Sequence, residues 1–321
     1  MLTRRVVLAA APAALATGSH AATDSFADFL AGIRAEARRA GISPRILDSA
    51  LAGLAPDPKV LERDRHQPEF TMTWAQYRHL LVTDKRITAG RAAVRDNRNL
   101  LLAVQDRFGV SPAVITGIWG LESSFGAQTG DFLVVDALAT LAWDGHRASF
   151  FRPELMAALR ILDHGDVAPT GMTGSYAGAM GQPQFMPTSY LRYAVDFTGD
   201  GRRNIWTNRA DVLASIANYL ARCGWRAGQT WGQAVILPAG FNPAVAGREN
   251  KQPLEAWARQ GMRPLDGRWR ATADTPAAIV LPDGATGEAF AVYPNFSAIR
   301  RYNPSDFYAL VVGLLGDDLV A

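Results

Sequence analysis

One segment of the sequence constrains the fold most strongly, because it reads as a short helix with a carboxylate on its apolar face. Residues 111–126 begin with Ser-Pro, a favourable N-cap and first-turn pair, and end with a glycine that is typical of a helix stop. Ile115, Ile118 and Trp119 fall on one face, and Glu122 continues that face. The sequence therefore predicts a helix of about three turns with a carboxylate where another apolar residue is expected.

Two interpretations of Glu122 follow from this pattern. If the face is buried or lines a cleft, Glu122 is poorly solvated near the negative end of the helix dipole, and its pKa should be raised. Such a carboxylic acid can donate a proton. The alternative is that the helix is rotated slightly and that Glu122 reaches solvent at the helix end.

The composition is that of an ordinary globular protein and excludes several function classes. The chain has 321 residues, 48% of them hydrophobic, which is enough for a sizeable core or two modest ones. Its 33 basic and 30 acidic residues give a net charge of +3, too small and dispersed to indicate a nucleic-acid surface. The sequence contains no zinc-spaced Cys/His cluster, no phosphate-binding glycine loop and no Gly-x-Ser-x-Gly motif.

The first residues have the pattern of an export signal. Arg4 and Arg5 precede an apolar run, and a small-x-small site at residues 19–21 predicts a mature chain that starts near Ala22. The arginine pair is a partial twin-arginine pattern, so the general secretory and twin-arginine routes both stay open. No later run reaches the roughly 20 apolar residues of a membrane span, and the single Cys223 lies far from the cleavage site. We expect a soluble periplasmic protein that is not a lipoprotein.

The order of patterns along the chain predicts a mainly α protein. After a signal peptide (1–21), residues 22–105 form a predicted N-terminal helical region, with one helix expected at about 89–108. Residues 106–225 and 293–321 are predicted to form a core with further helices at about 153–162, 209–222 and 304–315. Between them, short apolar runs separated by Pro and Gly predict a small β-containing insert at 226–292.

A glycine-rich block at residues 174–190 is a candidate ligand site. Gly174, Gly178 and Gly181 leave few bulky side chains, so the backbone can approach a ligand closely. The structural alternative is a tight helix crossing followed by a helix that begins at Pro187. The block also carries uncharged polar and aromatic side chains suited to amino sugars, namely Ser175, Gln182, Gln184, Tyr176, Phe185 and Tyr190.

An acidic loop follows the glycine-rich block. Asp196, Thr198 and Asp200 alternate as do the first ligands of a calcium loop, with the carbonyl of Arg202 at the seventh position. The twelfth position is not Glu, and Asp211 is the candidate to close the site. An Asx-type turn with solvated carboxylates is the alternative.

Several segments together resemble the B family of membrane-bound lytic murein transglycosylases, whose soluble members are included. The matching segments recur in order at residues 117–126, 136–142, 175–187, 193–201 and 295–303. The resemblance implies a lysozyme-like α+β catalytic core, in residues 106–225 with 293–321. The expected substrate is the glycan strand of peptidoglycan; partners in cell-wall synthesis or division are not identified.

The resemblance also implies the reaction, that of a carbon-oxygen lyase. Glu122 would be the single acid and base that cleaves the β-1,4 bond between N-acetylmuramic acid and N-acetylglucosamine without water and forms 1,6-anhydromuramyl products. No cofactor is required for this chemistry. Two alternatives stay open: a hydrolytic muramidase that uses Asp131 or Asp136 as a second carboxylate, as ordinary glycosidases do, and a catalytically silent peptidoglycan-binding protein.

The family pattern further implies which side chains bind substrate. Ser175 and Gln184 would contact acetamido or hydroxyl groups, and Tyr302, followed by Asn303, would orient Glu122 or the acetamido group. Arg147 would meet the peptide stem or the lactyl carboxylate. The other groove candidates are Tyr77, Tyr308 and Phe185. The acidic loop resembles a calcium site of the family, so structural calcium is expected there.

Overall fold

The computed structural model describes residues 25–65 and 72–320, which form two compact units. One unit comprises residues 25–65 and 122–216, and the other comprises 72–121 and 217–320. The predicted export signal lies outside the described residues, and the predicted domain boundaries stay a prediction. Among the helices that the structure describes, none is both long and apolar enough to cross a membrane.

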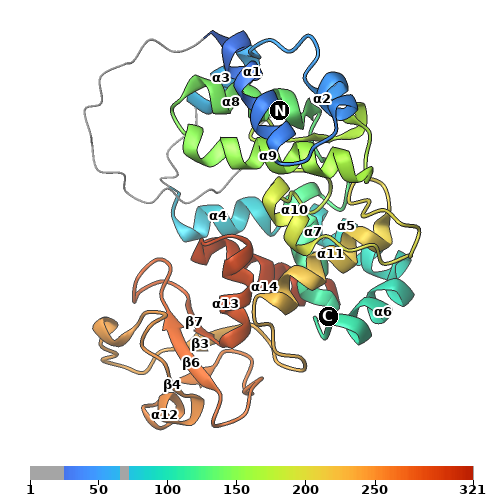
Figure 1. The fold of residues 1–321 in the computed structure, drawn as a ribbon. Helices are drawn as coiled ribbons and strands as arrows, with labels where there is room; N and C mark the ends of the chain where they lie inside the picture. Colours follow the sequence, from blue (N-terminus) through green and yellow to red (C-terminus); the bar gives the residue numbers. More distant parts are fainter. Residues whose placement is uncertain (1–24, 66–71, 321) are drawn as a thin grey trace. The chain divides into compact units, whose positions relative to one another are not determined.

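The first unit is built around two buried helices that follow each other in the chain, α8 (Val134–Asp144) and α9 (Ala148–His164). Around them lie α1 (Phe26–Arg39), α2 (Pro44–Ala50), α3 (Pro58–Arg65) and α10 (Pro187–Tyr193), with the short elements β1 (Phe132–Leu133), η1 (Pro169–Gly171) and β2 (Thr173–Gly174). Leu138, Phe151 and Leu159 are fully buried in this core. Figure 1 shows α8 and α9 in green beside the blue α1 and α2.

The second unit combines helices with a small sheet. Its helices are α4 (Trp74–Leu81), α5 (Asp84–Asp96), α6 (Arg98–Phe108), α12 (Leu254–Arg259), α13 (Pro294–Tyr302) and α14 (Asp306–Val320). Apolar α14 is buried along most of its length and packs on α4, α5 and α13. Two further helices, α7 (Pro112–Ser123) and α11 (Arg209–Arg222), contain the boundaries between the units.

Small residues bring α7 against α14. A Cβ at Gly117 would lie 2.6 Å from the carbonyl oxygen of Val312, and one at Gly316 would lie 2.6 Å from that of Ala113. Helices whose backbones approach so closely have no room for a side chain at the crossing. The crossing therefore fixes the helix that carries Glu122 in its last turn.

The sheet of the second unit is antiparallel, with strand order β4-β6-β7-β3-β5. Its strands are β3 (Gly232–Ile236), β4 (Gln252–Pro253), β5 (Arg263–Pro264), β6 (Pro276–Val280) and β7 (Ala289–Val292), and η2 (Pro243–Val245) lies between β3 and β4. Trp257 of α12 and Ile279 of β6 are fully buried in its core. Figure 1 shows these strands in orange with α12 next to β4. The predicted mainly α chain with a small β-containing insert is confirmed.

Some helix boundaries differ from the sequence prediction. The helix expected at 89–108 is two helices, α5 and α6, which are separated by Asn97. The helix expected from Pro153 begins at Ala148, so Pro153 lies inside it, where its missing N–H removes one backbone hydrogen bond. The helix expected at 304–315 begins at Asp306 and is preceded by α13.

Candidate active site

The helix predicted to carry the catalytic acid is present, and its apolar face is buried. In α7, Ile115 and Ile118 are 0% exposed and Trp119 is 1% exposed. Glu122, which continues that face, is half-buried. The residue is neither sealed in the core nor fully in solvent, as a proton donor that must meet a substrate requires.

A strained turn directly after Glu122 ends the helix. Ser123 is fully buried, and its Oγ accepts a hydrogen bond from the N–H of Gly126 at 3.1 Å. Ser124 (φ 50°), Phe125 (φ 59°) and Gly126 (φ 90°) are all left-handed, a conformation that non-glycine residues rarely adopt. Backbone strain of this kind is found where the surrounding structure holds a functional group in place.

Within the glycine-rich block, residues 174–185 form a compact backbone structure. A Cβ at Gly174 would lie 2.1 Å from the carbonyl oxygen of Ala179, so the chain folds back on itself there. The N–H of Ser175 donates to that same oxygen at 2.8 Å, and Met180 and Phe185 exchange two backbone hydrogen bonds of 2.8 and 3.2 Å. The block is therefore held mainly by its own backbone.

The structure brings the glycine-rich block against the loop that follows Glu122. The side-chain amide of Gln184 donates to the carbonyl of Thr129 at 2.9 Å and to that of Gly181 at 2.7 Å. A Cβ at Gly126 would lie 2.5 Å from Oε1 of Gln182, so these residues also approach closely. Gln184 itself is left-handed, with φ 52°. The loop that follows Glu122 is thus joined to the block predicted to hold the sugar by contacts within the first unit.

The side chains predicted to bind sugar in this block are placed unequally. Ser175 is fully buried, and its Oγ accepts a hydrogen bond from the N–H of Ala179 at 3.0 Å. Phe185 is 2% exposed and belongs to the core, whereas Gln184 is half-buried. Substrate contact by these three side chains stays a prediction.

Arg147, also in the first unit, forms an ion pair with Asp64, and its guanidinium lies 4.9 Å from the ring centroid of Phe151. A carboxylate of the substrate would have to share this arginine with Asp64. Its role in binding a peptide stem or a lactyl carboxylate stays a prediction.

The remaining predicted substrate residues lie in the second unit. Tyr302 ends α13, and its ring packs on that of Tyr219 in a tilted arrangement with 4.7 Å between the ring centroids. Asn303 accepts a hydrogen bond from the N–H of Ser305 at 3.1 Å. Tyr77 and Tyr308 are largely buried, at 7% and 4% exposure. The contact predicted between Tyr302 and Glu122 stays a prediction.

The acidic loop forms hydrogen-bonded turns. Both carboxylate oxygens of Asp196 accept backbone N–H groups, from Gly199 at 2.6 Å, Asp200 at 3.2 Å and Gly201 at 2.8 Å. Slight desolvation opposes these hydrogen bonds, but together they lower the pKa of Asp196. The carboxylate of Asp200 in turn accepts the N–H of Arg202 at 2.9 Å.

The residues proposed as calcium ligands do not form a preassembled cation site. Fully buried Asp211 accepts the N–H groups of Phe197 at 2.9 Å and Asn204 at 2.8 Å, and Oγ1 of Thr198 faces Asp196 at 3.4 Å. Burial raises the pKa of Asp211. Within residues 25–65 and 72–320, no three His, Cys, Asp or Glu side chains gather around one point. Calcium binding by this loop stays a prediction, and no step of the reaction is derived through calcium.

Sequence reasoning missed the ion pair that anchors this acidic loop. Arg203 donates to Asp166 through its backbone N–H at 2.9 Å and through its guanidinium at 2.6 Å, and its carbonyl accepts the hydroxyl of Tyr190 at 2.6 Å.

The left-handed turn at Ser124 and Phe125 was also missed. It had no signal in the sequence, because neither residue type favours that conformation.

Comparisons with known proteins identify the family. Residues 25–317 match the family model described as "Transglycosylase SLT domain". The chain is 35% identical, over 76% of its length, to membrane-bound lytic murein transglycosylase B of Escherichia coli K12, and it spans 66% of that protein, just under two thirds.

Solved structures agree with this match. A crystal structure of SltB3 from Pseudomonas aeruginosa in complex with NAG-anhNAM-pentapeptide has a TM-score of 0.89 and 43% identity, over 92% of this chain and 80% of that one. The Escherichia coli lytic transglycosylase SLT35 in complex with calcium has a TM-score of 0.76 and 31% identity, over 94% and 95% of the two chains. The predicted fold class and the predicted family are thereby confirmed, and the chain belongs to the transglycosylase SLT domain family.

Proposed function

We propose that this chain is an exported peptidoglycan lytic transglycosylase with Glu122 as its single acid and base. The bond cleaved is the β-1,4 bond between N-acetylmuramic acid and N-acetylglucosamine. The relatives named above are lytic transglycosylases, and the crystallised SltB3 complex holds a disaccharide that bears a pentapeptide. The substrate proposed for this chain is accordingly a glycan strand with peptide stems.

The chemistry balances without water. Glu122 first gives its proton to the glycosidic oxygen, which leaves as the 4-hydroxyl of N-acetylglucosamine. The 2-acetamido group of the muramyl residue stabilises the electron-poor C1. The carboxylate of Glu122 then takes the proton of the muramyl 6-hydroxyl as that oxygen attacks C1. A 1,6-anhydro ring forms, and Glu122 is protonated again, ready for the next cycle.

The observation that carries this proposal is the position of Glu122. It lies in the last turn of a helix fixed by a close backbone crossing, it is half-buried, and the loop that follows it is joined to the glycine-rich block by Gln184. A half-buried carboxylate is less well solvated than an exposed one, which favours its protonated form and supports a role as proton donor.

The hydrolytic alternative finds less support. A second carboxylate must be ionised to act as a nucleophile or as a base on water. Burial raises the pKa of Asp136, in the first turn of α8, despite an opposing hydrogen bond from its own backbone. Asp131 is exposed, just ahead of β1.

Product analysis on purified sacculi tests the reaction type. We expect muropeptides with 1,6-anhydromuramyl ends, each lighter by one water than a hydrolysis product, and mass spectrometry separates the two. Reducing muramyl ends would instead identify a muramidase. A wild-type protein that binds glycan strands and releases nothing would identify a silent binding protein.

Glu122→Gln tests the catalytic residue. The substitution removes the transferable proton and keeps the shape, so the rate of sacculus lysis should fall at least about a hundredfold. Melting temperature and glycan binding should stay unchanged. Asp131→Asn and Asp136→Asn are the matched controls, because one of the two would stop a hydrolase that uses that residue as its second carboxylate, and neither should stop a transglycosylase.

Structural calcium and export are separate parts of the proposal. Calcium in the acidic loop would raise the melting temperature of the wild type, and Asp196→Asn would remove that rise, since a ligand that binds only the folded state stabilises it. An unchanged melting temperature with calcium and with chelator would argue against the site. Export would yield a periplasmic protein whose N-terminal residue lies near Ala22.

A further inference from the structure

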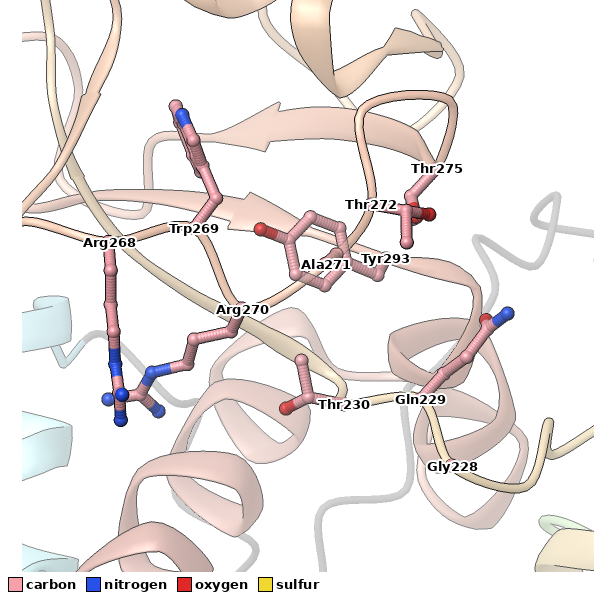
Figure 2. A pocket seen from close by; sticks show the side chains of 10 residues that line it. All are labelled: Gly228, Gln229, Thr230, Arg268, Trp269, Arg270, Ala271, Thr272, Thr275 and Tyr293. Carbon is pink, nitrogen blue, oxygen red and sulfur yellow. The ribbon is translucent and has the colours of Figure 1, made fainter.

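A pocket of about 460 Å³ lies in the second unit, in the part of the chain that contains the sheet. Its walls are the segment 228–230, the loop between β5 and β6, and the ring of Tyr293 (Figure 2). None of the residues predicted to bind sugar lines it. The pocket therefore needs an explanation of its own.

One wall is held rigidly from below by a single buried amide. Gln233 of β3 is 2% exposed, and its Nε2 donates to the carbonyl of Arg268 at 2.9 Å. Its Oε1 accepts the N–H of Arg270 at 2.7 Å and the hydroxyl of Tyr293 at 2.8 Å. This satisfied network fixes an otherwise irregular loop, here called the arginine loop (residues 265–275), and such preorganisation is typical of binding sites.

The arginine loop points its two guanidinium groups the same way. In Figure 2 the side chains of Arg268 and Arg270 extend to one side of the segment and Trp269 to the other. Arg270 is neutralised by Asp266 at 3.0 Å and Asp317 at 2.7 Å. Arg268 is exposed and has no acidic partner among the residues that the structure describes.

The other walls are uncharged and polar. Thr230, Thr272 and Thr275 supply hydroxyl groups and Gln229 an amide, and the described lining includes no Asp or Glu. A guanidinium binds a carboxylate with two parallel hydrogen bonds, whereas hydroxyl and amide groups match peptide N–H and C=O groups. The lining thus combines a cation for one carboxylate with partners for a short peptide backbone.

We propose that this pocket binds an acidic peptide through Arg268, as a second contact with the peptide stem of the substrate. That the peptide is a stem of peptidoglycan rests on the proposed function, but the binding of an acidic peptide to this pocket does not. Arg268 makes the ion pair with a stem carboxylate, and Gln233 holds the arginine loop in the shape that receives it.

Direct binding tests the proposal with a defined probe. The probe is a synthetic tetrapeptide with one side-chain carboxylate and a free C-terminal carboxylate, titrated calorimetrically into the wild-type chain. We expect saturable binding that weakens at least about tenfold in Arg268→Gln, because a charge-assisted hydrogen bond is lost. Arg268→Lys should restore part of the affinity, because lysine keeps the positive charge but cannot form the two parallel hydrogen bonds of a guanidinium.

Matched controls separate this site from general attraction. Arg263→Gln removes an exposed arginine from the same sheet outside the pocket and should leave the affinity unchanged. The same tetrapeptide amidated at both carboxylates should bind at least about tenfold more weakly. Equal binding of acid and amide, equal binding by wild type and Arg268→Gln, or phosphate binding as tight as the peptide would overturn the proposal.

Turnover distinguishes this proposal from the proposed function. Arg268→Gln should raise KM on peptide-bearing sacculi and leave kcat, and all kinetics on peptide-free glycan strands, unchanged. If KM stays unchanged while Glu122→Gln is inactive, the peptide site is wrong and the transglycosylase stands. If the wild type forms no anhydro products but binds the tetrapeptide through Arg268, the proposed function is wrong and the peptide site stands.

Discussion

The glycine-rich block and the arginine loop hold polar groups in place by opposite means. In the glycine-rich block, backbone hydrogen bonds and close backbone contacts hold the chain in place, as at Gly174 and Ala179, and the side chains carry no charge. In the arginine loop, the buried side chain of Gln233 in strand β3 holds the backbone in place, and the polar groups on display are guanidinium ions. The first arrangement suits a neutral sugar beside an acid, and the second suits an anion.

The largest expected effect comes from adding one methyl group to the block. Gly174→Ala would place Cβ 2.1 Å from the carbonyl oxygen of Ala179, where the closely packed backbone leaves no room for it. We expect the free energy of unfolding to fall by about 3 kcal/mol, the upper part of the range for overpacking, and lysis to fall with it. Chemical denaturation measures the change.

Gly32→Ala in α1 is the matched control. A Cβ at Gly32 meets nothing within 4 Å, so alanine should stabilise that helix by about 0.5–1 kcal/mol. If both substitutions gave the same change, the block would not be held by close backbone contact.

A smaller loss is expected when the amide beneath the arginine loop is removed. Gln233→Leu leaves the carbonyl of Arg268, the N–H of Arg270 and the hydroxyl of Tyr293 without their partner. The unfolding free energy should fall by about 2 kcal/mol, and affinity for the acidic tetrapeptide should fall while activity on peptide-free strands persists.

Gln260→Leu provides the comparison for that substitution. Gln260 is exposed on the same part of the chain, so the change should stay within about 0.5 kcal/mol. Loss of peptide-free activity in Gln233→Leu would show that the loop supports the whole fold and not a separate site.

The smallest effect is a pH dependence in the loop's own ion pair. Burial raises the pKa of Asp317 above 3.8, although Arg270 and a hydrogen bond from Trp231 oppose the shift. The folded chain therefore holds this proton to a higher pH than the unfolded chain does. The stability from this group is complete below the unfolded value and declines as pH rises through the folded pKa.

Asp317→Asn should flatten that decline, as measured by unfolding at a series of pH values. Arg270→Gln should move the decline to higher pH, because the positive charge that lowers the pKa is gone. Identical slopes in all three proteins would mean that Asp317 does not titrate differently on folding.

Sequence reasoning went far in the first unit and in α7. The capped helix at residues 112–123, its buried face and the half-buried Glu122 follow the periodicity of the chain. The glycines of the glycine-rich block predicted a close approach of the backbone, which the structure has at Gly174. The break between α5 and α6 at Asn97 was not, because both helices keep apolar faces and Asn is a weak breaker.

The sequence by itself determined most of the helices, the presence of a small β-containing insert, the glycine-rich block and the carboxylate in the last turn of α7, because these signals come from residues a few positions apart. Only the tertiary structure decided that Gln184 ties the block to the loop after Glu122, that Asp211 holds backbone amides, and that Gln233 shapes the arginine loop. Those partners lie at separations of 55, 14 and 35 residues. Local periodicity carries no signal for such pairs, since their side chains meet only after the backbone has folded.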